Sequence, residues 1–279
     1  MTFIIHGATG AQGAPVATAL LQAGHSVTAA VRNPQTYQQG PAVAIDLSNA
    51  AALADAYTGV DGVFVHLPLG SPGQQLELAR TIIAAVDEAR PARVVFSTSG
   101  YDLGEGEDSP HGVLMRGLLD TGVSTAIIAP RLYLENLLLP PVIAAAREHG
   151  VLPYPIRADY RVSWSSHLDV ADVAAQLFDR VDITGTIAVG ARPGLLGDDL
   201  AAGFAAYLAH PVRFESQTPE AFGDSLIPIF GGDAMTPVID SYRARSTQQD
   251  DVIDASRSAQ TLLGRHPRSV EAWLRDTNA

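Results

Sequence analysis

The first two-thirds of the chain alternates short apolar runs, rich in β-branched residues, with longer segments rich in alanine and leucine. Short runs of this kind predict strands and the longer segments predict helices. Strands are expected at 2–6, 26–31, 42–46, 62–67, 93–98 and 124–129. Helices are expected at 11–23, 50–57, 74–88, 110–120 and 133–149, the last kinked at Pro140-Pro141. This alternation predicts an α/β fold, a Rossmann-like doubly wound parallel sheet.

After Gly150 the pattern becomes less regular. It predicts short strands at 151–156 and 160–164, a helix at 169–180, and a further sheet strand at 186–190. The rest is expected to be helical with one strand at 212–215. We therefore expect residues 1–150 with 168–192 to form the sheet core. Residues 151–167 with 193–279 would form a smaller region within the same structural unit, capping the carboxyl edge of the sheet, where ligands bind in such folds.

Composition excludes several classes of chemistry. The chain has 279 residues, no cysteine and a net charge of −12, and all 18 of its basic residues are arginine. Thiolate nucleophiles, disulfides and lysine Schiff bases are therefore impossible. A strongly acidic chain is a poor partner for nucleic acid or anionic membranes. The most apolar stretch, 126–146, is interrupted by charges and prolines, and the N-terminus does not resemble a signal peptide. We expect a cytoplasmic protein.

A glycine-rich motif follows the first predicted strand and opens the first helix. It reads Gly7-Ala8-Thr9-Gly10-Ala11-Gln12-Gly13. Such glycines permit a tight turn, close approach of backbone N–H groups to a pyrophosphate, and close packing of helix on strand. The helix N-terminus adds unpaired N–H donors and the positive end of a dipole. A βα turn that binds no ligand is the alternative, but the strand–turn–helix context favours a dinucleotide site.

The second predicted strand ends in Val31-Arg32-Asn33-Pro34. A site that prefers NAD would carry an acidic residue here, whereas an arginine suits the 2′-phosphate of NADP. We therefore favour NADP(H) over NAD, the alternative being a solvated arginine. Asp46 with Leu47 could line the adenine, or Asp46 could form a turn. The other expected cofactor contacts are His66, Leu67, Ser97, Thr98 and Pro130.

The combination of motifs resembles the NmrA-like group of atypical short-chain dehydrogenases/reductases. That group includes NADPH-dependent quinone reductases, triphenylmethane reductases and redox-sensing regulators. The resemblance covers nearly the whole chain. It is carried by Gly7–Gly13 with Arg32-Asn33-Pro34, by Thr121-Gly122-Val123, and by the segments 127–136, 169–174 and 263–273. Two departures stand out. Arg131 replaces the glycine usual after Pro130, near the expected nicotinamide position, and 111–116 holds no lysine.

The usual catalytic pair of this superfamily, Tyr-x-x-x-Lys, cannot occur because the chain contains no lysine. Quinone reduction depends least on that pair, since orientation over the nicotinamide and one hydrogen-bond donor can suffice. The candidate catalytic residues are Ser99, Tyr101, His111 and Tyr133. Each has a structural alternative: a backbone contact for the serine, a surface histidine at a helix start, or a core aromatic.

The predicted substrate contacts are Tyr133, Asn136, Tyr154, Trp164 and His167. Tyr154 and Trp164 could form an aromatic wall for a flat substrate, or Trp164 could be a core residue. The eight histidines lack metal-ligand spacing, so no metal is expected. The leading hypothesis is an NADPH-dependent reductase of an apolar aromatic quinone or polyketide-type ketone. The alternative is a non-catalytic NADP(H) sensor that binds a partner protein. The sequence leaves the oligomeric state open.

Overall fold

A computed structural model describes residues 1–101 and 108–279. Contacts divide the chain into two units. Unit 1 comprises Met1–Pro130, His167–Val189 and Ser256–Arg265. Unit 2 comprises Arg131–Ser166, Gly190–Ala255 and His266–Ala279. These boundaries differ from the predicted ones, because 131–150 belongs to unit 2 and 256–265 to unit 1. The chain leaves the sheet at the end of a strand, Pro130, and Ser256–Arg265 adds a short helix beside the last sheet strand.

Unit 1 is built on a parallel sheet of seven strands in the order β3-β2-β1-β4-β5-β6-β8. The strands are β1 (Thr2–His6), β2 (Ser26–Val31), β3 (Ala42–Ala44), β4 (Gly62–His66), β5 (Val94–Ser97), β6 (Thr125–Pro130) and β8 (Gly185–Val189). The order reverses between β1 and β4, and ligands bind at such a switch point in doubly wound sheets. The predicted fold class is confirmed.

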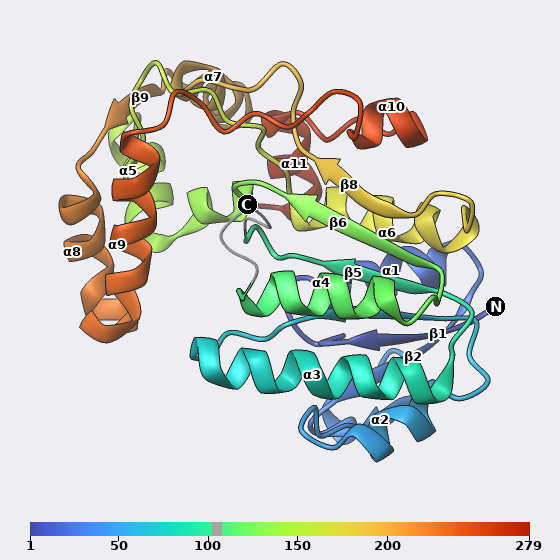
Figure 1. The fold of residues 1–279 in the computed structure, drawn as a ribbon. Coiled ribbons are helices and arrows are strands. Elements are labelled where there is room, and N and C mark those ends of the chain that lie inside the picture. The colour runs from blue at the N-terminus through green and yellow to red at the C-terminus, as the bar shows by residue number, and fades with distance from the viewer. Residues whose placement is uncertain (102–107) are drawn as a thin grey trace. The chain divides into compact units, whose positions relative to one another are not determined.

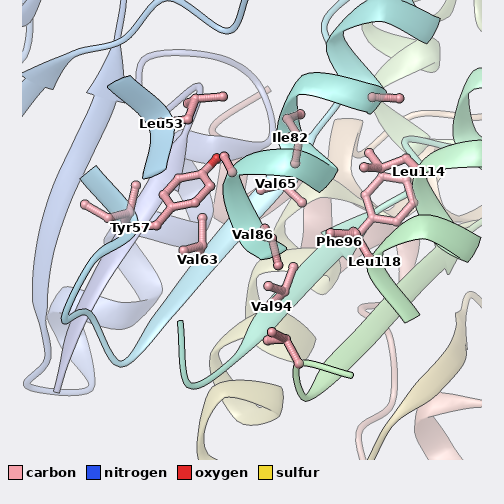
Figure 2. Close-up of a cluster of buried hydrophobic side chains, with 14 of the residues drawn as sticks. Leu53, Tyr57, Val63, Val65, Ile82, Val86, Val94, Phe96, Leu114 and Leu118 are labelled. Carbon is pink, nitrogen blue, oxygen red and sulfur yellow. The ribbon is translucent and has the colours of Figure 1, made fainter. Parts of the chain in front are cut away.

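Helices cover both faces of this sheet (Figure 1). They are α1 (Gly13–Gln22), η1 (Pro34–Thr36), α2 (Ala50–Tyr57), α3 (Pro72–Ala89), α4 (Pro110–Asp120), α6 (His167–Asp179) and α10 (Ala259–Leu263). α2, α3 and α4 pack side by side on one face, and α1 packs beside α6 on the other. Apolar side chains from α2, α3 and α4 meet those of β4 and β5, including Val63, Val94 and Phe96, in one buried cluster (Figure 2). Burial on both faces explains why these strands are continuously apolar.

Unit 2 is mainly helical. Its elements are η2 (Leu134–Leu138), α5 (Pro140–His149), β7 (Val151–Tyr154), α7 (Gly197–Leu208), β9 (Arg213–Ser216), α8 (Pro219–Phe230), α9 (Gly232–Ser246) and α11 (Val270–Thr277). β7 and β9 form a two-stranded parallel sheet, α5 packs on β7, and α8 packs against α9.

Two predicted elements of unit 2 differ from the structure. The helix expected at 133–149 is interrupted rather than kinked, because Leu139 has extended backbone (ψ 136°) ahead of Pro140. The strand expected at 160–164 forms only isolated bridges at Val162, to Leu195 and Asp251. Pro193, two residues before Leu195, has no N–H to continue a ladder of hydrogen bonds.

Arg93 fixes the end of α6 to the sheet within unit 1. The side chain is 1% exposed at the start of β5. Its Nε donates to the Leu177 carbonyl at 3.1 Å, and one terminal nitrogen donates to the Ile183 carbonyl at 2.5 Å. Further donations reach Ser124, Arg180 and Val181. A cation suits this place because the carbonyls at the end of a helix carry partial negative charge.

Replacing Arg93 should destabilise unit 1 strongly. In Arg93→Met the carbonyls at the end of α6 lose buried donors, so the free energy of unfolding should fall by about 3 kcal/mol. Arg80→Met is the matched control, because Arg80 is exposed on α3, and it should change the free energy by less than about 0.5 kcal/mol. Urea unfolding followed by circular dichroism measures both. Equal effects of the two substitutions would contradict this role.

Candidate functional site

The glycine-rich loop joins β1 to α1 at the switch point of the sheet, and two of its glycines are required by geometry. Gly7 has a φ of +60°, and a β-carbon there would lie 2.6 Å from His66 Nε2. A β-carbon on Gly13 would lie 2.3 Å from the Gly7 carbonyl oxygen and 2.4 Å from that of His6. Gly10 closes the turn, since its N–H donates to the Gly7 carbonyl at 2.7 Å. The strand and the helix therefore approach each other as closely as a dinucleotide-binding turn requires.

The N-terminus of α1 is open to an anion. Gln12 is the N-cap residue, but its side chain makes no capping hydrogen bond, and the first turn holds no acidic residue. Thr9, Gly10 and Ala11 are exposed on the loop before it. Unsatisfied N–H groups and the helix dipole favour phosphate at this place. These residues fit the pyrophosphate of a dinucleotide.

The end of β2 offers a cation for a second phosphate. Arg32 is exposed, and within the described part of the chain its side chain has no ion pair or hydrogen bond. The neighbouring Asn33 instead caps η1 by accepting from the Gln35 N–H at 3.2 Å. The guanidinium of Arg32 is thus available to a ligand.

Asp46 and Leu47 have local structural contacts. The Asp46 carboxylate accepts hydrogen bonds from the Ser48 hydroxyl at 2.6 Å and the Ser48 N–H at 2.9 Å, and these bonds lower the pKa of Asp46. Leu47 packs against the buried apolar cluster of unit 1. The side chain of Asp46 therefore forms a turn, which was the alternative for this residue. An adenine contact of Asp46 or Leu47 stays a prediction.

Side-chain hydrogen bonds join the glycine-rich loop to the end of β5. The Ser97 hydroxyl donates to Gln12 Oε1 at 2.8 Å, and Gln12 Nε2 donates to the Ser99 hydroxyl oxygen at 2.8 Å. The Ser99 N–H in turn donates to the Ser97 hydroxyl oxygen at 3.3 Å. The structure thus brings together three residues that the sequence placed in one site without indicating their contacts. The hydroxyl of the neighbouring Thr98 is buried and has no partner in the described chain.

Tyr101 follows this network two residues after Ser99, and its ring stacks on that of His111. Their ring centroids are 4.1 Å apart with planes 15° from parallel. Tyr101 is 46% exposed, whereas His111 is only 2% exposed and its Nε2 has no hydrogen bond among the described residues. Of these two predicted catalytic residues, Tyr101 is open to solvent, and its ring stacks on the buried imidazole of His111.

Four histidines of unit 1 carry lowered pKa values. They are His6, His66, His111 and His167, at the ends of β1 and β4 and the starts of α4 and α6. Burial, and to a smaller extent interaction with His66, lowers the pKa of His6 to about 3 and those of His111 and His167 to about 4. Burial also lowers the pKa of His66. All four are neutral at pH 7, so they act through N–H groups and lone pairs rather than as cations.

The protonation state of His6 can be tested in solution through the pH dependence of stability. The Tyr57 hydroxyl and His6 Nε2 share a hydrogen bond at 2.6 Å inside unit 1. The unfolded chain binds a proton at His6 below its ordinary pKa of 6.5, whereas the folded chain does so only near pH 3. The stability that His6 contributes is therefore complete above pH 6.5 and lost as the pH falls below it.

His6→Asn should make the folded protein less sensitive to acid. Between pH 8 and pH 5.5 its free energy of unfolding should fall by about 1.4 kcal/mol less than that of the unaltered protein. At pH 8 the variant should be the less stable of the two, because the buried Tyr57 hydroxyl loses its hydrogen-bond partner. Urea unfolding at the two pH values measures both effects. An equal loss for both proteins would show that His6 is not held neutral.

The other predicted substrate residues lie in unit 2, apart from His167 in unit 1. Tyr154 and Trp164 are fully buried and pack edge to face, with ring centroids 5.4 Å apart, next to Phe222 and Tyr242. The Tyr154 hydroxyl bonds to that of Tyr242. These rings belong to the interior of unit 2, which was the alternative for Trp164. Asn136 also bonds to Tyr154.

Tyr133 and Arg131 stand at the start of unit 2. Tyr133 is buried and bridges Ser165 in backbone pairing. Arg131 Nε lies 3.2 Å from an Asp251 carboxylate oxygen, and Arg245 Nε lies 3.6 Å from the other. The cation that replaces the usual glycine therefore has a carboxylate partner within its own unit.

Leu69 is an exposed residue that the sequence analysis missed. It follows β4 and is 91% exposed. Its loop is anchored on both sides. The Gln75 side chain donates to the Pro68 carbonyl at 2.8 Å, and Ser71 with Gln74 forms a capping box at the start of α3. The only signal in the sequence is an apolar residue between Pro68 and Gly70, which does not separate a buried turn from an exposed one.

Two further searches found nothing within the described residues. No cluster of histidine, aspartate or glutamate there could hold a metal ion. No helix among them is long and apolar enough to cross a membrane.

Solved structures share this fold over the whole chain. A triphenylmethane reductase from Citrobacter sp. is 17% identical with a TM-score of 0.80, and both chains are fully covered. The NADPH-dependent quinone oxidoreductase of Escherichia coli, solved with NADPH, is 22% identical with a TM-score of 0.74, again over both full chains. The UDP-N-acetylglucosamine 4-epimerase of Bacillus cereus is 14% identical with a TM-score of 0.72 over both full chains. No curated protein sequence matches the chain.

The model of one protein family matches residues 1–274. The match spans the glycine-rich loop, the Arg32 strand end and both units, and it confirms the resemblance seen in the sequence. The chain belongs to the NmrA-like family.

Proposed function

We propose that this chain is an NADPH-dependent reductase of an apolar, aromatic substrate, a quinone or an aromatic ketone. The observation that carries the proposal is the open N-terminus of α1 behind a glycine turn, with the unpaired Arg32 at the end of the neighbouring strand. This pair of sites matches the pyrophosphate of a dinucleotide and the 2′-phosphate that distinguishes NADP(H) from NAD(H). The similarity to reductases of quinones and triphenylmethane dyes supports it.

The residues at the carboxyl edge of unit 1 would provide binding and orientation. NADPH, when bound, supplies a hydride from its nicotinamide ring. Backbone N–H groups of Ala11 to Gly13 would hold the pyrophosphate, and Arg32 would hold the 2′-phosphate. The other proposed contacts of the cofactor lie at, or directly after, the carboxyl ends of β4, β5 and β6: His66, Leu67, Ser97, Thr98 and Pro130.

The substrate would meet apolar surface and neutral donors. Leu69 and Tyr101 are large side chains exposed at the ends of adjacent strands β4 and β5. These two side chains would offer apolar surface to a flat aromatic substrate. His111 is neutral at pH 7, so it cannot supply a proton as an imidazolium. Ser99 and Tyr101, which follow β5, stay the candidate hydroxyl donors, and Tyr133, Asn136 and His167 stay proposed substrate contacts.

The alternative is an NADP(H) sensor that acts through a partner protein. The missing Tyr-Lys pair and the burial of Tyr154 and Trp164 favour it, because they remove a proton relay and an aromatic wall. Cytoplasmic location and the absence of nucleic-acid partners stay predictions from composition alone.

Cofactor preference tests the role of Arg32. A charge-assisted bond to phosphate contributes about 1.5–3 kcal/mol, so NADPH should bind roughly 10–150-fold more tightly than NADH. Arg32→Ala should remove most of that ratio, chiefly by weakening NADPH binding. Arg80→Ala, an exposed arginine of α3, is the control and should keep the ratio. Titration by nicotinamide fluorescence measures each dissociation constant. Equal affinities of the unaltered protein for both cofactors would contradict the assignment.

Turnover separates the reductase from the sensor. With NADPH in excess, we expect oxidation of the cofactor by benzoquinones, naphthoquinones, triphenylmethane dyes or aromatic ketones, and no conversion of UDP-sugars. Because His111 is already neutral, the rate should not follow a titration between pH 6 and 8 that depends on this residue. The same pH profile in His111→Gln checks this point. Tight NADPH binding without turnover of any of these substrates would instead support the sensor.

A further inference from the structure

We infer that Gln12 is a positioning residue, which sets the direction of the Ser99 hydroxyl toward the substrate. This inference rests on the proposed function. It concerns a side chain of the glycine-rich loop, a loop otherwise expected to act through its backbone. Three hydrogen bonds carry it: the Ser97 hydroxyl to Gln12, Gln12 to the Ser99 hydroxyl, and the Ser99 N–H to Ser97.

The direction of each hydrogen bond follows from burial. The Ser97 hydroxyl is fully buried, and its oxygen already accepts from the Ser99 N–H, so its own hydrogen needs an acceptor. Gln12 Oε1 is that acceptor at 2.8 Å. The other end of the amide, Nε2, is therefore the end that faces Ser99 and donates to it. With one donor bound to its oxygen, Ser99 retains its hydroxyl hydrogen for another partner.

The backbone at Ser99 is consistent with a functional side chain. Its φ is +58°, a conformation that costs a residue with a β-carbon roughly 1–2 kcal/mol relative to the right-handed region. Glycine would occupy this position without strain, as the next residue, Gly100, does with a φ of +86°. Side chains held in strained backbone at the edge of a site are frequently functional. Ser99 is also only partly buried, so its hydroxyl can reach a ligand.

The side chain of Gln12 is free for this role because it does not cap α1. During reduction of a carbonyl, hydride adds to the substrate and negative charge grows on its oxygen. A preset O–H donor stabilises that charge without having to reorient. The proton that completes the product comes from water, so Ser99 is unchanged after each cycle. A neutral hydroxyl suits a site whose histidines are neutral and whose chain has no lysine.

A double-mutant cycle between Gln12 and Ser99 tests the inference. The variants are Gln12→Met, Ser99→Ala and the double substitution. A fourth variant, Ser97→Ala, removes the hydroxyl that donates to Gln12 Oε1, so that the Gln12 amide is free to rotate. Single-turnover oxidation of saturating NADPH by the best quinone or ketone is measured, so that changes of cofactor affinity do not enter the rate. Gln176→Met is the matched control, since among the described residues the side chain of this glutamine of α6 bonds only to the Leu263 carbonyl.

We expect Gln12→Met to slow hydride transfer about tenfold, in line with loss of one oriented hydrogen bond. Ser99→Ala should slow it at least as much, and the double variant should be no slower than Ser99→Ala. Ser97→Ala should slow it less than Gln12→Met, and Gln176→Met should stay within about twofold of the unaltered rate. Far-UV circular dichroism and NADPH titration confirm that each variant is folded.

Multiplicative losses in the double variant would overturn the inference, because they would mean that Gln12 acts independently of Ser99. An unchanged rate for Ser99→Ala would overturn it as well. Failure of the proposed function is seen elsewhere, in the unaltered protein. If that protein binds NADPH and turns over none of the substrates, both the reductase and this role of Gln12 fall together.

Discussion

The close packing of α1 on the end of β1 is the constraint on which the rest of the site depends. No β-carbon fits at Gly13, where the helix backbone lies against the carbonyls of His6 and Gly7. This contact directs the N-terminus of α1, with its unsatisfied N–H groups, to the switch point of the sheet. It also requires the positive φ of Gly7, and His66 fills the space that a side chain there would take. The same contact therefore places the anion site at the N-terminus of α1 and leaves room at Gly7 for His66, the last residue of β4.

A chain without lysine needs another source of polarity at such a site. Here the positive charge comes from a helix dipole and from Arg32, while the nearby imidazoles are kept neutral by burial. The remaining donors are hydroxyl groups, and one of them is tied through Gln12 to the nucleotide loop. Such donors are suited to an acceptor whose reduced oxygen is only weakly basic, which is the physical reason to prefer quinones over simple ketones. The apolar side chains of Leu69 and Tyr101 are consistent with that choice.

Local patterns were sufficient to predict most of unit 1. The bounds of β1, β2, α2 and α4 agree with the sequence, because apolar runs, N-cap residues and prolines at helix starts act over a few residues. The glycine motif could be placed for the same reason. The isolated bridges at Val162 and the burial of Trp164 depend on distant partners. The break before Pro140 is a local effect of that proline on Leu139, for which the sequence analysis expected only a kink. The bond between Gln12 and Ser99 spans 87 residues, and no spacing rule in a single sequence indicates it.

The central claim is that NADPH, held in one orientation by this loop, gives up a hydride. The most direct measurement compares single-turnover rates with unlabelled NADPH and with NADPH carrying deuterium on one or the other face of the nicotinamide. A cofactor fixed on the loop presents a single face to the substrate. We therefore predict slower oxidation with one of the two labelled cofactors and the unlabelled rate with the other. Oxidation that is insensitive to both labels, or equally slowed by each, would contradict hydride transfer from a fixed nicotinamide.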